Sequence, residues 1–363
     1  MPRHVNCWEL HKREHLFYCT DCMTTPEFRR DPLNNIWVVF APERQRRPQD
    51  FDAATLKPDT LDPFAEGNER LTPREVYAIR KEKSKPNEPG WRVRVVPNRY
   101  PAMRVEGALD SAPVGIYDRL TGIGAHEVII ETPKGDLALE ELTVSSIAEV
   151  FASYRERIID LDKDSRFRHI YVFKNVGPSA GASIAHAHSQ LVALPLVPPL
   201  VEAKLKRAHD HYLLKQRSLF TDILHTEQTD GNRMVAENDG YALFCPFASR
   251  FPFEMTIFPK RHHAEFISCT TNELNDLGEI LRFALQRLNT VLEKPGYNLL
   301  LHMAPLHRPD NERFASSRHD YCWHLEIVPR FNALAGFEIG LGAYINTVFP
   351  EEAARYLRGE VRA

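Results

Sequence analysis

The chain has 363 residues, of which 43% are hydrophobic, and its formal net charge is −3. A charge this close to zero creates no field that attracts nucleic acid or an anionic membrane, and no apolar run reaches the roughly 18 residues of a membrane span. Six cysteines in a chain of this length do not form a disulfide scaffold. We therefore expect a cytoplasmic enzyme of roughly two or three domains, without nucleic-acid or membrane partners.

The first 26 residues contain a cluster of potential zinc ligands. Four of them follow the spacing Cys-x3-His-x7-Cys-x2-Cys, namely Cys7, His11, Cys19 and Cys22. Thiolate and imidazole are the ligands that tetrahedral zinc prefers, and the spacing is similar to the first half of a B-box-type zinc knuckle. His4 and His15 are alternative fourth ligands, and unrelated terminal cysteines are the structural alternative. We predict a small structural zinc knuckle over residues 1–26 that does not carry the chemistry.

Two stretches of the next hundred residues offer polar side chains to a ligand. A predicted buried strand over residues 36–40 is followed by Arg44 and Arg47, whose guanidinium groups suit phosphate oxygens but also suit a solvated loop. Residues 52–90 are polar, charged and rich in proline, and are predicted to be loops. A further strand over residues 91–96 ends in a turn, where Asn98 either contacts a nucleotide or caps the turn.

An internal repeat organises the remainder of the chain. Each copy is predicted to be strand, helix, strand, loop and strand, and the matching segments are 126–130 with 253–257, 142–161 with 274–292, 169–174 with 297–302, and 188–192 with 324–328. The last strand of each copy opens on a histidine, His188 or His324. The second copy has a longer loop, residues 305–321, before that strand. The repeat predicts two similar α+β halves, residues 27–200 and 201–363, whose sheets could join.

The stretch from Asn175 to Pro195 carries the strongest chemical signal. His186 and His188 stand at i and i+2 before an apolar run, so in a strand they point to the same face. The small-residue loop 177–183 lies upstream, and its backbone N–H groups are free to meet an anion. Taken alone, His188 is more simply a structural histidine. Together, the pair and the loop predict a nucleophile or base beside a phosphate cradle.

These landmarks resemble the galactose-1-phosphate uridylyltransferase family of the histidine-triad superfamily, in which ADP-glucose phosphorylase is a close relative. The resemblance spans roughly residues 28–358 and rests on ordered motifs at residues 29–33, 41–44, 94–98, 126–128, 175–190, 252–254 and 344–346. It implies an α+β fold of two tandem histidine-triad-like halves, with largely antiparallel sheets flanked by helices, beside the small N-terminal Cys/His knuckle.

The resemblance also implies nucleotidyl transfer by double displacement through a covalent nucleotidyl-histidine. The usual motif His-Pro-His-x-Gln reads His186-Ala187-His188-Ser189-Gln190 here. By this match His188 is the nucleophile, Gln190 contacts the transferred phosphoryl group, and His186 supports them. Substrate contacts carried over from the family are Arg44, Arg47, Asn98, Asn175 and Ser183.

Three functions follow in order of preference. The first is a nucleotidyltransferase of galactose metabolism that moves UMP between UDP-glucose and galactose 1-phosphate. The second is an ADP-sugar phosphorylase or adenylyltransferase. The third is a non-catalytic nucleotide-binding or zinc-docking protein, which the retained His188 and Gln190 disfavour. The family further implies a homodimer.

The metal sites of the family are altered in this sequence. The first uses a Cys-x-x-Cys, a downstream histidine and the first motif histidine, but the dicysteine positions here read Asp62-Pro63-Phe64-Ala65. Asp62, His126 and His186 either hold a weaker metal or form a metal-free site kept by hydrogen bonds, which we favour. A second family site would involve His302 and His324, with Glu326 where a third histidine can occur. We do not expect that site to be intact, although these three residues could still bind one ion.

Overall fold

The computed structural model of the protein describes residues 26–42, 61–308, 316–331 and 334–361. Several predicted site residues lie outside these ranges and stay predictions, namely Cys7, His11, Cys19, Cys22, Arg44 and Arg47. The N-terminal knuckle and the boundary that it sets at residue 26 stay predictions for the same reason. In the described part of the chain, no helix combines the length and the apolar character needed to cross a membrane.

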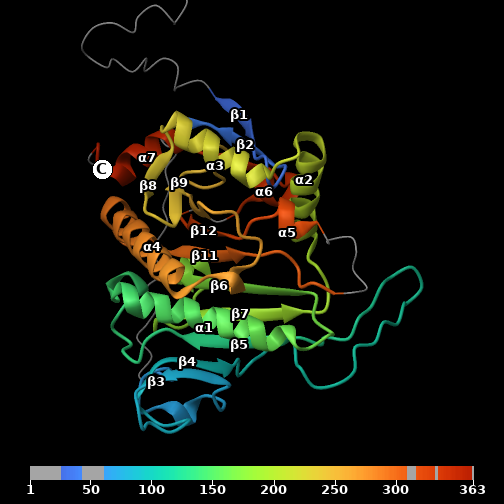
Figure 1. Cartoon of the computed structure of the whole chain (residues 1–363), viewed down its shortest axis with the longest axis vertical. Coiled ribbons are helices and arrows are strands. Elements are labelled where there is room, and N and C mark those ends of the chain that lie inside the picture. The colour runs from blue at the N-terminus through green and yellow to red at the C-terminus, as the bar shows by residue number, and fades with distance from the viewer. Residues whose placement is uncertain (1–25, 43–60, 309–315, 332–333, 362–363) are drawn as a thin grey trace, which may run out of the picture.

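A ten-stranded sheet forms the centre of the molecule, in the order β3-β4-β5-β7-β6-β11-β12-β10-β9-β8 (Figure 1). The first half contributes β3 (Tyr77–Arg80), β4 (Trp91–Pro97), β5 (Ala125–Ile130), β6 (His169–Val176) and β7 (His188–Leu194). The second half contributes β8 (Met234–Glu237), β9 (Tyr241–Phe244), β10 (Met255–Pro259), β11 (Tyr297–His302) and β12 (His324–Pro329). Every pairing in this sheet is antiparallel.

The order of strands is the same from the outer edge inward in both halves, and the halves meet where β6 pairs with β11. The predicted α+β fold with joined, antiparallel sheets is therefore confirmed. One local prediction was wrong, because β3 lies within the segment that the sequence indicated as loop. Its four residues are flanked by prolines and charges, and as an edge strand β3 is paired along one side only, with β4.

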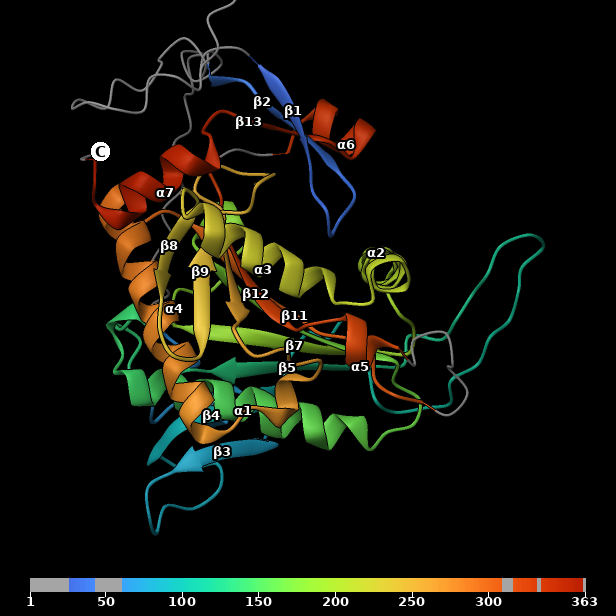
Figure 2. The same cartoon turned by 45° about the horizontal axis from the view of Figure 1, so that its top comes forward.

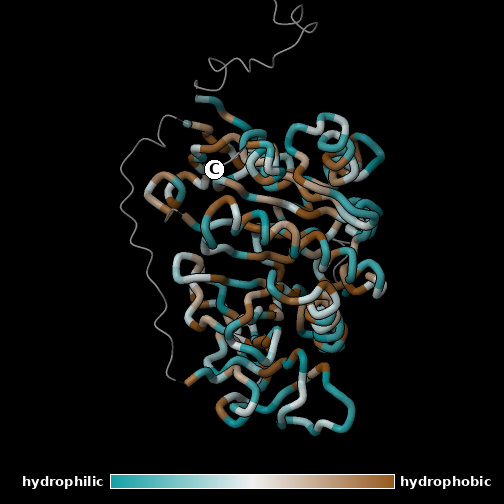
Figure 3. Tube along the Cα trace, turned by 90° about the vertical axis from the view of Figure 1, so that its left-hand side faces the viewer, coloured by the Kyte–Doolittle hydropathy of each residue, from teal (hydrophilic) through white to brown (hydrophobic). Residues whose placement is uncertain are grey.

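Helices α1 (Val144–Asp162) and α4 (Thr271–Leu292) pack against each other and against one face of the sheet (Figure 1). Each begins after a threonine, Thr143 or Thr270, whose hydroxyl accepts a backbone N–H of the first turn. Their apolar stripes meet alternate strand residues in one continuous core that runs through both halves. In Figure 3 hydrophobic stretches recur along the chain through the middle of the molecule.

The remaining elements cover the other face and one end of the sheet. Helices α2 (Pro199–Lys215), α3 (Leu219–Asp230) and α5 (Ser317–Asp320) belong to the second half, where α2 and α3 share a smaller core with β9 and β10. A three-stranded sheet of β1 (Glu27–Arg30), β2 (Trp37–Phe40) and β13 (Tyr344–Asn346) lies with α6 (Gly336–Leu341) and α7 (Pro350–Arg358) near the β8 end (Figure 2). Single-turn 3₁₀ helices occur at Glu69–Leu71, Leu139–Glu141, Pro178–Ala180 and Phe266–Ser268.

Candidate active site

His188 is the first residue of β7, and it is buried, with 8% of its surface exposed. Residues alternate between the two faces of a strand, so His188 and Gln190 share the face opposite α1, while Leu191 packs in the core with α1. The Nδ1–H of His188 donates to the backbone carbonyl of His186 at 2.7 Å. Because the hydrogen is on Nδ1, the lone pair is on Nε2, which has no hydrogen-bond partner among the described residues.

The environment of His188 favours the neutral imidazole. Burial lowers the pKa of His188 below 6.5, and the positive charge of Lys174 lowers it further. Lys174 lies on the α1 side of the neighbouring strand, where its Nζ is 2.7 Å from Glu131 Oε2 and 3.2 Å from the carbonyl oxygen of His188. The hydroxyl of Ser189 donates to the carboxylate of Glu131, and it also contacts the hydroxyl of Tyr154 on α1. A buried polar network therefore holds the strand that carries His188.

Gln190 is oriented through His126 on β5. The backbone N–H of Ala102 donates to His126 Nδ1 at 3.2 Å, so the hydrogen of this ring is on Nε2. That Nε2–H donates to Gln190 Oε1 at 2.9 Å, which leaves the amide N–H groups of Gln190 available to a phosphoryl oxygen. Asn98 adjoins the pair, since its Nδ2 is 3.1 Å from His126 Nε2, and its Oδ1 accepts the N–H of Tyr100 and so caps the turn.

His186 is fixed by two short hydrogen bonds. Its Nε2–H donates to the carbonyl of Thr132 at 2.7 Å, and its Nδ1 lies 2.7 Å from Asp62 Oδ2, so one proton is shared between ring and carboxylate. Gly135 packs against this pair, because a Cβ there would lie 2.5 Å from Asp62 Oδ2 and 3.1 Å from His186 Nδ1. Both nitrogens of His186 are occupied by protein atoms, and His126 bonds Gln190 instead. Asp62, His126 and His186 therefore do not fit a metal ion.

The small-residue loop is supported from the second half of the chain. Gly177 and Gly181 have φ values of +78° and +85°, a conformation that favours glycine. The Nδ2 of Asn298 on β11 donates to Asn175 Oδ1 at 2.8 Å and to the carbonyl of Ala180 at 3.0 Å. Ser183 is exposed on the same loop. The loop conformation thus depends on a strand that lies more than a hundred residues further along the chain.

Comparison with known proteins identifies the family. The model for the N-terminal domain of galactose-1-phosphate uridyl transferase matches residues 16–198. ADP-glucose phosphorylase from Arabidopsis thaliana is 34% identical over 342 residues, which cover 92% of this chain and 93% of that protein. The chain belongs to the galactose-1-phosphate uridylyltransferase family. A second model, for a domain of unknown function (DUF4921), matches residues 134–361 of this family member.

Two kinds of relative, ADP-glucose phosphorylases and galactose-1-phosphate uridylyltransferases, align along nearly the whole chain. Galactose-1-phosphate uridylyltransferase from Thermotoga maritima is 27% identical over 345 residues, covering 92% of this chain and 98% of that protein. The structure of A. thaliana ADP-glucose phosphorylase with bound ADP-glucose superposes with a TM-score of 0.78 at 33% identity, covering 93% of this chain and 100% of that one. A uridylyltransferase structure gives a TM-score of 0.71 at 26% identity. This member of the family is thus an enzyme of the nucleotidyltransferase and phosphorylase type.

Several residues that shape the site were not found from the sequence. Lys174 and Glu131 are charged residues at the ends of apolar strands, and Asn298 is a polar residue within one. Such placement is the signal that could have indicated them, because a buried polar side chain needs a partner. Gly135 gave no signal beyond its place in a turn.

Proposed function

We propose that the chain transfers the nucleoside monophosphate of a nucleotide sugar to a second substrate through a nucleotidyl-His188 intermediate. The observation that supports this most strongly is the Nε2 lone pair of His188, which no described residue engages, while Nδ1–H is held by the His186 carbonyl. Nε2 attacks the α-phosphorus, a P–N bond forms, and the P–O bond to the sugar 1-phosphate breaks with its electron pair on the leaving oxygen. A phosphate oxygen of the acceptor then displaces His188.

The neighbouring groups have roles that suit this transfer. The amide N–H groups of Gln190, freed by the bond from His126, donate to the phosphoryl oxygens as charge develops on them. Asn175 and backbone N–H groups of the small-residue loop add further donors. His186, held by Asp62 and Thr132, keeps its own carbonyl in place to orient His188. Each of these donors is preorganised, which is how a phosphoryl centre is stabilised without prior rearrangement.

The preferred donor is an ADP-sugar, with phosphate as acceptor and ADP and a sugar 1-phosphate as products. The higher identity to ADP-glucose phosphorylase, 34% against 27% for a uridylyltransferase over a similar span, supports this choice. The second candidate is the exchange of UMP between UDP-glucose and galactose 1-phosphate, which the sequence motifs alone placed first. Both use the same covalent step and differ in the base that is bound and in the acceptor.

One experiment separates these functions. The protein is incubated with ADP-glucose or UDP-glucose radiolabelled at the α-phosphate, and acid-labile, base-stable label on the protein is counted. Stronger labelling from ADP-glucose, discharged by inorganic phosphate, supports the phosphorylase, whereas labelling from UDP-glucose, discharged by galactose 1-phosphate, supports the uridylyltransferase. If neither donor labels the protein but both bind, the non-catalytic alternative is the better account.

We further propose that the N-terminal cluster of Cys7, His11, Cys19 and Cys22 binds one structural zinc ion, on the basis of its ligand spacing. Metal analysis of the purified protein beside a Cys19→Ser variant tests this, and equal zinc content in the two would contradict it. We also propose that the chain forms a homodimer, as the resemblance to the family implies. Sedimentation equilibrium of the full chain tests this.

A further inference from the structure

The second half contains a cluster of metal-type ligands away from His188. His302, His324 and Glu326 each offer one ligand atom, and these atoms lie within 4.8 Å of one another. They belong to the adjacent strands β11 and β12, where His302 is paired with His324. In the part of the chain that the structure describes, this is the one group of three or more such residues. Two imidazoles and a carboxylate are a donor set that zinc accepts.

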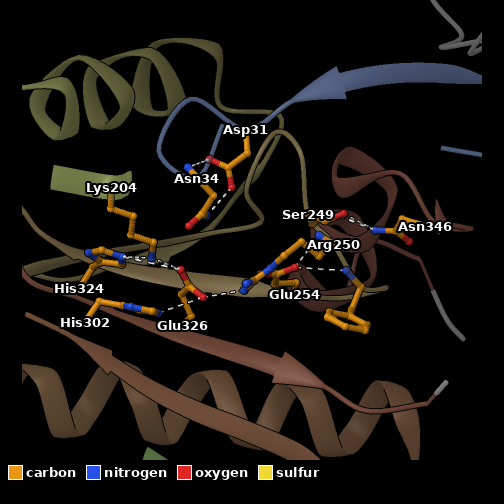
Figure 4. A network of polar contacts seen from close by, with 11 residues as sticks. Asp31, Asn34, Lys204, Ser249, Arg250, Glu254, His302, His324, Glu326 and Asn346 are labelled. Atoms are coloured by element: carbon orange, nitrogen blue, oxygen red, sulfur yellow. Dashed lines mark hydrogen bonds and ion pairs between the residues drawn. The ribbon is translucent and has the colours of Figure 1, made fainter. Parts of the chain in front are cut away.

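A lysine from helix α2 already fills this cluster. Lys204 is 3% exposed, and its ammonium lies 2.9 Å from Glu326 Oε1 and 3.2 Å from His324 Nε2 (Figure 4). An ammonium group can only donate, so His324 Nε2 is the acceptor. The hydrogen of the His324 ring is on Nδ1, because Nδ1–H donates to the carbonyl of Cys322 at 3.0 Å. The lone pair that a metal would need on His324 is therefore engaged by Lys204.

The charges of the cluster are also balanced without a metal. Glu326 Oε2 accepts a hydrogen bond from Arg250 at 2.6 Å and lies 3.2 Å from His302 Nε2. Its other oxygen, Oε1, accepts the hydrogen bond from Lys204, so both oxygens of this buried carboxylate are engaged by protein groups. Arg250 is also paired with the buried carboxylate of Glu254, so two cations face two carboxylates. A divalent ion added beside Lys204 would meet like charge in a buried site, which is strongly unfavourable.

We propose that Lys204 is a built-in cation that takes the place of a metal ion among His302, His324 and Glu326. It joins α2 to the strands of the second half, as a bound ion would, and it keeps a latent metal site closed. The residues therefore do not fit a resident metal at this position. Removal of the ammonium group should leave three ligands and a vacant fourth position, which suits a tetrahedral ion with one water.

The test compares metal uptake by the full chain and its variants. After chelator treatment, each protein is dialysed against Co²⁺ or Zn²⁺, and bound metal and cobalt absorption are measured. Lys204→Ala should bind one more equivalent per chain than the wild type, and Lys204→Ala with His302→Gln should lose it. Lys206→Ala is the matched control, because Lys206 is an exposed lysine of the same helix and should not change the metal content. Differences between variants report on this cluster, since metal at the N-terminal cysteines contributes equally to each.

Two results would overturn the proposal. The first is a folded Lys204→Ala protein that gains no metal. The second needs no change at Lys204: if the wild type holds a metal equivalent that His302→Gln alone removes, a metal and not the lysine fills the cluster. That comparison stands even if Lys204→Ala fails to fold. Neither result depends on the nucleotidyl transfer proposed for His188, which is measured separately.

Discussion

The two halves of the molecule present the same histidine geometry with opposite consequences. His188 and His324 each open the last strand of their half, and each donates Nδ1–H to the carbonyl two residues earlier, at 2.7 Å and 3.0 Å. The difference lies at Nε2, which accepts a hydrogen bond from Lys204 at His324 but has no partner at His188 in the part of the chain that the structure describes. The local fold therefore produces a potential nucleophile in both halves, and the group that meets Nε2 decides whether the lone pair is available.

The second half also contributes to the first. Asn298 bonds both Asn175 and the small-residue loop, and a Cβ at Gly296 would collide with Ser179 of that loop. The second half, in which the Nε2 lone pair of His324 is engaged by Lys204, thus supports the small-residue loop beside His188. Four predictions sharpen this contrast, taken from the largest expected effect to the smallest.

The largest effect is expected at His188, and His324 is its matched position in the second half. His188→Ala should reduce nucleotidyl transfer on the order of 10⁴-fold or more and abolish covalent labelling, because the attacking lone pair is removed. His324→Gln is the matched change in the second half and should retain labelling, since His324 Nε2 is engaged by Lys204. The measurement is single-turnover labelling with donor labelled at the α-phosphate. A His324 variant that folds normally but no longer labels would break the comparison.

The next effect concerns the donor beside the nucleophile. Gln190→Ala should lower the rate of nucleotidylation by about 10²–10³-fold, as expected when one preorganised donor to a developing negative charge is lost. The substrate concentration for half-maximal rate should change much less. The control is Glu326→Gln, which changes the equivalent position of the second half and should leave the rate near that of the wild type. Equal losses in both variants, with Glu326→Gln still folded, would contradict a single chemical centre.

A smaller effect is expected from the contact between the halves. Asn298→Ala removes two hydrogen bonds to the loop, so the free energy of unfolding should fall by about 1–2 kcal/mol. The loop should also hold the substrate less well, with a rate loss of up to about 10²-fold. Denaturant unfolding and steady-state rates measure the two quantities. Asn275→Ala is the control, because Asn275 is half-buried and its side chain makes only an exposed hydrogen bond to Thr271 within α4. An Asn298 variant that matches it in both quantities would remove the support assigned to the second half.

The smallest effect is a shift in pH dependence. Attack requires the neutral imidazole, and the pKa of His188 is lowered from 6.5 by burial and by Lys174. The rate of nucleotidylation should therefore stay level as pH falls through 6.5 and decline only below it. Replacing the ion pair with Lys174→Met and Glu131→Gln together should move the midpoint upward, because the charge of Lys174 outweighs that of Glu131. A midpoint that stays in place or moves down would show that the ion pair does not act on His188.

Much of the fold and the order of the site motifs could be predicted from the sequence. The repeat was visible because strand and helix periodicities recur with matching histidines, and the 186–190 motif places its residues on one strand face. Contacts between distant segments could not be predicted in this way. Lys204 meets His324 across 120 residues and Asn298 meets Asn175 across 123, and no spacing rule encodes such pairs.

Contacts between distant segments also decide the two family metal sites, which the sequence left open. The sequence grouped His126 with Asp62 and His186, whereas the fold brings His126 to Gln190 and sets Gly135 beside the other two. It also indicated His302, His324 and Glu326 as possible ligands but did not reveal the lysine between them. The short strand β3 was missed because its polar surroundings are typical of loops, and pairing with β4 outweighs that local preference.

The most direct test of the central claim is the site of the covalent adduct. The wild-type protein is mixed with ADP-glucose or UDP-glucose and stopped in base, and the mass of the intact chain and of its peptides is measured. We predict one nucleoside monophosphate per chain, located on His188. An adduct on His324, or one on each of the two histidines, would contradict the account in which one half carries the nucleophile and Lys204 closes the other.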